Sequence, residues 1–184
     1  DFEGRMFWAG DLSGPRATPG KYTMEIKYND TTYQQSFTIK KDPRSTATDE
    51  DYRLYYEFAK EIRDTISAAH KAILSIRDLR QQLSGYKERL KEDTIKKEIT
   101  RIDSIMTKIE ETLYQTKNKG SQDALNYPIR LTNKLAYLNA ILDAGEYRPT
   151  QQQYEVRTEL ETQLYEQLQK FEKVKTEMIP ALNK

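Results

Sequence analysis

The sequence predicts a mainly α-helical protein with a small β part: an up-down-up-down four-helix bundle preceded by a partial, Ig-like antiparallel β-sheet. Three observations lead to this fold class. Residues 48–83 hold a heptad-like apolar stripe without a glycine or a proline, which is typical of a bundle helix. Apolar and polar side chains alternate in two segments within residues 21–40, as in strands with one covered face. Three later segments repeat the helical spacing, so the first helix has partners for its stripe.

Composition excludes several function classes. The 184 residues include 30 basic and 29 acidic side chains, which leaves a formal net charge of +1. No long block of one sign is present, so the sequence lacks the electrostatic signature of a nucleic-acid binder. The absence of cysteine excludes disulfides, thiolate nucleophiles and cysteine metal sites. No run approaches the roughly 20 apolar residues of a membrane helix, so we expect no membrane span.

Residues 1–43 are predicted to form a partial β-sandwich of two or three strands. Segments 21–28 and 32–40 should pair as an antiparallel hairpin, because Asn29-Asp30-Thr31 between them is typical of a turn. Residues 5–10 are the candidate third strand. The alternation places one set of side chains on a common side of the hairpin, which we expect to face a core rather than a sugar: Tyr22, Met24, Ile26, Tyr28, Tyr33, Phe37 and Ile39.

The predicted sheet has few strands, since a sandwich usually has about seven. We therefore expect either that it leans on the helices or that it is the end of a β domain that begins upstream. The first residues lack the basic and apolar regions of a signal peptide, and the start of the sequence resembles a cut inside a larger protein.

Residues 44–184 are predicted to form the four-helix bundle. Asp42-Pro43-Arg44 closes the last strand, because proline cannot continue a β-ladder. Thr48 is the expected N-cap of the first helix, with Asp51 at the third helical position. This helix should end near Ser84-Gly85, since glycine readily adopts the left-handed conformation of a helix cap.

The second helix is predicted from about residue 93 to residue 113. Its apolar residues follow alternating spacings of four and three: Ile95, Ile99, Ile102, Met106, Ile109 and Leu113. The third helix should begin near Pro128 and end at Gly145, with proline in the first turn and glycine beyond the last.

Thr150 and Gln153 form a predicted capping box for the last helix, which Pro180 should break. Its stripe consists of Leu160, Leu164, Leu168, Phe171, Val174 and Met178.

No catalytic, cofactor-binding or metal-ligating residue is predicted. The sequence has no Gly-rich nucleotide loop, no zinc-protease motif and no hydrolase nucleophile elbow. The single histidine, His70, sits just off the apolar stripe and is expected at the surface. Phe7 and Trp8 are the candidate contact residues, for another domain or for a ligand, because they precede a sheet with too few strands to close.

Two stretches carry a resemblance to a known family. They are GPRATPGKYTMEIKYNDTTYQQSFTIKKDPR at 14–44, before a long helix, and LNYPIRLTNKLAYLNAIL at 125–142. Together they resemble the C-terminal region of large secreted Bacteroidetes-type proteins, which carry sortilin-like propellers of BNR repeats and are often labelled glycosyl hydrolases. The resemblance spans nearly the whole chain, and its more distinctive parts are the DPR junction and NYPIRLTNKL. It implies an extracytoplasmic location (periplasmic, cell-surface or secreted) and an upstream propeller domain as partner, where any catalytic residues would lie.

The expected function is therefore that of a non-catalytic C-terminal accessory region, which supports or extends an exported propeller. Two alternatives stay open at this point. A carbohydrate-binding module would need an exposed aromatic row that contacts a glycan. A part of a glycosidase would need a pocket with two opposed carboxylates.

Overall fold

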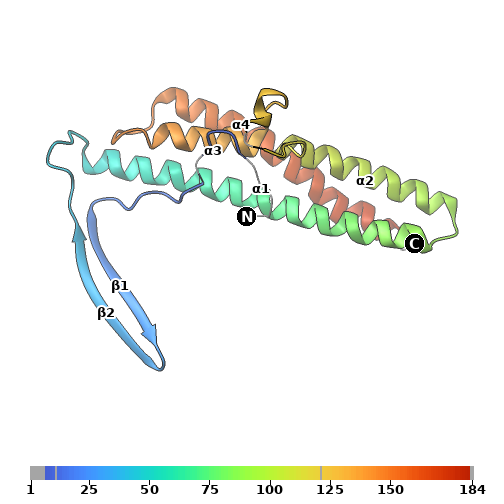
Figure 1. Cartoon of the computed structure of the whole chain (residues 1–184), viewed down its shortest axis with the longest axis horizontal. Helices are drawn as coiled ribbons and strands as arrows, with labels where there is room; N and C mark the ends of the chain where they lie inside the picture. Colours follow the sequence, from blue (N-terminus) through green and yellow to red (C-terminus); the bar gives the residue numbers. More distant parts are fainter. Residues whose placement is uncertain (1–6, 11, 121, 183–184) are drawn as a thin grey trace.

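The computed structural model describes residues 7–10, 12–120 and 122–182. The protein is mainly α-helical with a small antiparallel sheet, which confirms this part of the predicted fold class. The helices lie side by side in an elongated body, and a β-ribbon projects from the end at which the first helix begins (Figure 1).

Helix α1 (Asp49–Arg89) runs the length of the body. Thr48 is its N-cap, and a capping box with Asp51 confirms the predicted start. The predicted end at Ser84-Gly85 is wrong, because the helix continues through Gly85 to Arg89. Glycine costs about 1 kcal/mol inside a helix. The extra turns bring Leu90 against the apolar core, and this burial offsets the cost.

Helix α2 (Asp93–Leu113) has the bounds and the buried stripe that its spacing predicts. It runs antiparallel to α1, since Arg77 and Arg80 of α1 bond to Glu110 and Asp103 of α2 in reverse order. The fully buried side chains of α2 include Ile102, Met106, Ile109 and Leu113.

Helix α3 (Leu131–Leu142) begins later than predicted. A short 3₁₀ helix, η1 (Asp123–Leu125), precedes it, and Pro128 lies outside both elements. The Thr132 hydroxyl donates a 2.8 Å hydrogen bond to the Leu113 carbonyl, so the start of α3 lies against the end of α2. This long-range contact, rather than Pro128, fixes the beginning of α3.

Helix α4 (Gln151–Lys173) starts with the predicted capping box of Thr150 and Gln153. It continues through a π-helical segment, η2 (Val174–Met178), into the short α5 (Ile179–Ala181), which contains Pro180. The predicted break at Pro180 therefore takes the form of a widened helix before it. Proline has no N–H to donate and clashes with the preceding turn, and a π segment accommodates both effects.

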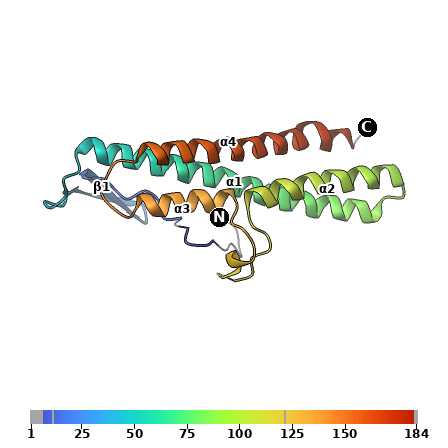
Figure 2. The ribbon, with the colours of Figure 1, turned by 90° about the horizontal axis from the view of Figure 1, so that it is seen from above.

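The helix directions do not alternate as up-down-up-down. Phe58 of α1 packs edge-on against Tyr154 of α4, and Thr65 bonds to Glu161 further along, so α1 and α4 run parallel. Helix α3 continues in the direction of α2, and the two lie end to end along α1 (Figures 1 and 2). The reason is length, because α2 and α3 are each much shorter than α1, which extends about 60 Å at 1.5 Å per residue.

Strands β1 (Gly20–Tyr28) and β2 (Thr31–Ile39) form the predicted antiparallel hairpin, with Asn29-Asp30 as its turn. Asn29 has a φ of 50°, a left-handed conformation that asparagine tolerates better than most residues. In the described part of the chain the sheet has only these two strands, and no helix packs against it.

The predicted third strand at residues 5–10 is not formed over residues 7–10, and residues 5 and 6 lie outside the described residues. The side chain of Asn133 accepts a 2.9 Å bond from the Trp8 amide and donates a 2.8 Å bond to the Trp8 carbonyl. These bonds tie the main chain to α3, so it does not pair with the hairpin. Gly10 lies so close to α3 that an added Cβ would be 2.8 Å from the Ala136 Cβ.

The register of the hairpin places its large apolar side chains on one face, as the alternation predicts. The expectation that this face is covered by a core is wrong, because nothing in the described chain packs over it. Tyr22 is half-buried, and the other five side chains are 48–69% exposed. We call the following six residues the ribbon face: Tyr22, Met24, Ile26, Tyr28, Tyr33 and Phe37.

His70 is buried, with only 3% of its surface exposed, so its predicted surface position is wrong. The ring of Phe7 lies 5.9 Å from the His70 ring and 6.1 Å from the Tyr114 ring. The segment around Phe7 therefore covers His70, a residue of α1 beside the apolar stripe, and shields it from solvent.

Candidate functional site

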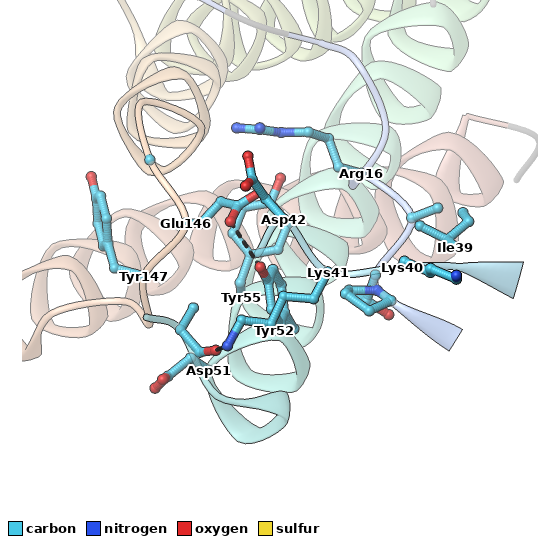
Figure 3. A pocket seen from close by; sticks show the side chains of 15 residues that line it. Arg16, Ile39, Lys40, Lys41, Asp42, Asp51, Tyr52, Tyr55, Glu146 and Tyr147 are labelled. Carbon is cyan, nitrogen blue, oxygen red and sulfur yellow. Dashed lines mark hydrogen bonds between the residues drawn. The ribbon is translucent and has the colours of Figure 1, made fainter. Parts of the chain in front are cut away.

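A cavity of about 110 Å³ lies where the ribbon joins the helices (Figure 3). Its walls come from the segment before β1, the segment after β2, the start of α1 and the turn between α3 and α4. Charged and aromatic side chains from all four segments meet there, so this ribbon base is the candidate site.

Arg16, in the segment before β1, attaches the ribbon to the end of α3. Its guanidinium donates to the Asp143 carbonyl oxygen, forms a 3.4 Å ion pair with the Asp143 carboxylate, and lies 5.8 Å from the centre of the Tyr55 ring. The Tyr55 hydroxyl donates to the same carboxylate. Burial raises the pKa of Tyr55, and this bond raises it further, so the phenol keeps its proton.

Helix α1 is joined to the turn after α3 by two further contacts. The Tyr52 hydroxyl donates a 2.8 Å bond to Glu146. Arg148 pairs with Asp51, the same carboxylate that caps α1 through the Thr48 amide and hydroxyl. The bonds from Thr48, together with Arg148, lower the pKa of Asp51 to about 2.

The segment after β2 is tied down in the same region. Asp42 accepts two bonds from the Arg44 side chain and one from the Arg44 amide. The Lys41 ammonium donates to the Ala47 carbonyl just before α1. The Ser45 hydroxyl lies 3.3 Å from the Tyr52 hydroxyl of α1, so the segment after β2 contacts the helical body there, while Arg16 joins the segment before β1 to the end of α3.

The carboxylates that line the cavity are poor general acids. Hydrogen bonds from Arg44 lower the pKa of Asp42, and those from the hydroxyls of Ser45 and Tyr52 lower the pKa of Glu146. Asp51 is held further still below its ordinary range. A glycosidase needs one carboxylic acid that stays protonated near neutral pH, which requires a raised pKa. The arrangement instead favours ion pairs that hold segments together.

Within residues 7–10, 12–120 and 122–182, no group of three or more histidine, cysteine, aspartate or glutamate side chains is placed to hold a metal ion. The cavity is lined by lysine and arginine as well as by carboxylates, a mixture that suits neither a hard cation nor a phosphate.

The ribbon face is the second candidate surface. Tyr22 and Phe37 lie opposite each other on the two strands, with ring centres 5.9 Å apart and an interplanar angle of 23°. Met24 and Ile26 continue the face toward the turn. The opposite side of the ribbon is polar, with cross-strand bonds between Thr23 and Ser36 and between Gln34 and Glu25.

The two residues predicted as contacts, Phe7 and Trp8, lie on the helical body beside α3 and not at the ribbon base. Phe7 is half-buried and packs on the core, so its ring already has an intramolecular role. Trp8 keeps 38% of its surface exposed while its main chain is fixed by Asn133. Of the pair, Trp8 is the better placed to meet another domain or a ligand.

Sequence reasoning missed Arg16, Asp143 and Glu146, which come together only in the fold. Arg16 and Asp143 are 127 positions apart, and neither belongs to a recognisable motif. The sequence held one weak indication of this site. Three charged residues, Asp143, Glu146 and Arg148, lie close together in the turn between the apolar stripes of α3 and α4.

Comparison with protein-family models, with curated proteins and with solved structures gave no match for this chain. In the described residues, no helix combines the length and the apolar character needed to cross a membrane.

Proposed function

We propose that this chain is a non-catalytic accessory region of a larger exported propeller protein, in which it acts as a scaffold. The helical body provides a rigid base, and the ribbon and Trp8 present surfaces to the upstream domain. The family resemblance of residues 14–44 and 125–142 supports the propeller partner and the extracytoplasmic location.

The observation that carries this proposal is the attachment of the ribbon. Before the hairpin, Arg16 bonds to Asp143 at the end of α3, and after the hairpin the Ser45 hydroxyl lies 3.3 Å from the Tyr52 hydroxyl of α1. A ribbon that no helix covers within the described residues would gain little from these two attachments if it were only a loose loop. Held at both ends, it can transmit the position of a docked domain to the helical body.

We further propose that the ribbon is the end of a partial Ig-like sheet whose remaining strands lie upstream. Its strict alternation of apolar and polar side chains supports this, since such alternation is typical of a sheet with one covered face. Two strands alone are marginally stable in water, and three or more strands, or packing against another element, usually stabilise a sheet.

A carbohydrate-binding module is the second candidate, and the exposed rings of Tyr28, Tyr33 and Phe37 favour it. Flat rings can stack on sugar rings. Met24 and Ile26 interrupt the row, however, and these side chains offer no flat surface for stacking. The mixture is more typical of the inner face of a β-sandwich, so the scaffold function is preferred.

Hydrogen exchange tests the proposal directly. Addition of the upstream domain to this chain should slow the exchange of the amides at residues 7–10, because Trp8 lies at the expected contact. Trp8→Ala should weaken the binding by about 1 kcal/mol or more, as expected for a buried aromatic contact. Tyr86→Ala, which removes another exposed aromatic ring at the far end of α1, should leave the affinity unchanged and serves as the control.

Two results would contradict the scaffold function. Hydrolysis of glycosides by the chain alone would show a catalytic site. Micromolar binding of an oligosaccharide that Trp8→Ala or Tyr33→Ala abolishes would favour the carbohydrate-binding module.

A further inference from the structure

We infer that the ribbon face packs against an uncharged face of a β-sheet in the upstream domain of the same polypeptide. This inference rests on the proposed function and names the surface through which it acts. It concerns the six side chains of the ribbon face, of which five are exposed and Tyr22 is half-buried within the described residues.

The charge distribution of the ribbon defines the chemistry of the partner. None of the positions on the ribbon-face side of the two strands carries a charge, since the polar residues there are Thr31 and Gln35. The charged residues, Lys21, Glu25 and Lys27, all lie on the other side. Charged side chains are depleted at the buried centre of protein interfaces, so the ribbon face matches an apolar surface without charges.

The size of the ribbon face decides between a second copy of this chain and a tethered domain. Nine residues at about 3.4 Å each give a length of about 30 Å, and two strands give a width of about 10 Å, so the flat footprint of the face is about 300 Å², and the accessible surface of its protruding side chains is on the order of twice that. A stable interface between separate molecules needs about 800 Å² on each partner. A second copy docked on this face alone would therefore bind weakly.

A domain in the same polypeptide meets this surface at a much higher effective concentration, in the millimolar range for short flexible linkers. A small interface is then sufficient. A sheet is the fitting partner because it offers a second flat apolar layer, at the roughly 10 Å spacing at which sheets stack. The aromatic side chains are long enough to fill a layer of that thickness.

The test compares two variants at neighbouring positions. Ile26→Thr removes an apolar group from the ribbon face, and Lys27→Thr makes the same type of replacement on the polar side. Threonine suits strands, so the hairpin should persist in both variants. Within the described residues no helix packs against the two strands, so the helical body should keep its melting temperature in both variants.

Exchange of the amides in residues 20–39 is then measured in the 184-residue chain and in the longer polypeptide with its upstream domain. We expect exchange to be at least about tenfold slower in the longer polypeptide, because a covered ribbon opens less often. Ile26→Thr should reverse most of this slowing, and Lys27→Thr should change it less than about twofold. The 184-residue chain should sediment as a monomer at micromolar concentration.

Each other outcome overturns the inference. If residues 7–10 become protected by the upstream domain while residues 20–39 do not, the ribbon-face contact is refuted and the scaffold function stands. If neither segment is protected, both proposals fail. A dimer of the 184-residue chain that Ile26→Thr dissociates would identify a second copy as the occupant. Binding of an oligosaccharide that Tyr33→Ala abolishes would identify a glycan.

Discussion

Glu110 is the most deeply buried carboxylate among the described ion pairs, with 5% of its side chain exposed. It accepts a 2.7 Å bond from Arg77 and a 3.1 Å bond from Arg80, both one helix away on α1. A carboxylate in this position costs desolvation energy that only its two partners offset. We therefore expect these two ion pairs to help set the register of α1 against α2.

Glu110→Ala should lower the free energy of unfolding by about 1–3 kcal/mol, because Arg77 and Arg80 each lose a hydrogen bond to a buried carboxylate, although Arg80 keeps its 2.8 Å bond to Asp103. The arginines are each about one-third exposed, so water limits the loss. Glu111→Ala at the exposed neighbouring position should change it by less than about 0.5 kcal/mol. Urea unfolding midpoints provide the comparison, and equal losses for the two variants would contradict the larger stabilising role assigned to Glu110.

The caps and stripes of single helices were predictable because they depend on residues close in sequence. Thr48 with Asp51 and Thr150 with Gln153 form the capping boxes that their spacing predicts. The end of α1 and the start of α3 were not predictable, since Leu90 and Thr132 respond to contacts with other helices. The ribbon shows the same limit, because alternation predicts which side chains share a face but not whether anything covers that face.

The N-cap of α1 should also affect how the stability of the protein falls as the pH becomes acidic. The pKa of Asp51 is about 2 in the folded protein, against an ordinary value of 3.8, so the unfolded chain binds a proton first as the pH falls. The contribution of Asp51 is therefore fully present above about pH 4 and is lost between about pH 4 and pH 2. Asp51→Asn should make the fall in melting temperature over this range smaller.

Asp49→Asn is the matched control, because Asp49 lies in the same first turn and its side chain makes no hydrogen bond within the described residues. It should leave the slope of melting temperature against pH close to that of the unmodified chain. An unchanged slope in Asp51→Asn would refute the role assigned to the cap and its arginine partner.

At the scale of the whole molecule, the helices form a closed core, whereas nothing in the part of the chain that the structure describes covers the apolar face of the ribbon. The core runs from Tyr55 near the start of α1 to Leu83 near its end, and side chains from α2, α3 and α4 complete it. The ribbon base connects these two parts through the contacts of Arg16 with Asp143 and of Ser45 with Tyr52. The sequence pattern predicted the helical core, but the ribbon base depends on contacts among four segments far apart in the chain.

The most direct test of this account is residue-resolved hydrogen exchange on the 184-residue chain alone. Amides of the ribbon should exchange by local opening, at rates far above those of Ile102 and Ile73 in the helical core, which should exchange only through global unfolding. The predicted result is a large gap between the two groups at neutral pH. Ribbon amides as protected as those of Ile102 would contradict the account, since they would show that the ribbon is already covered without an upstream domain.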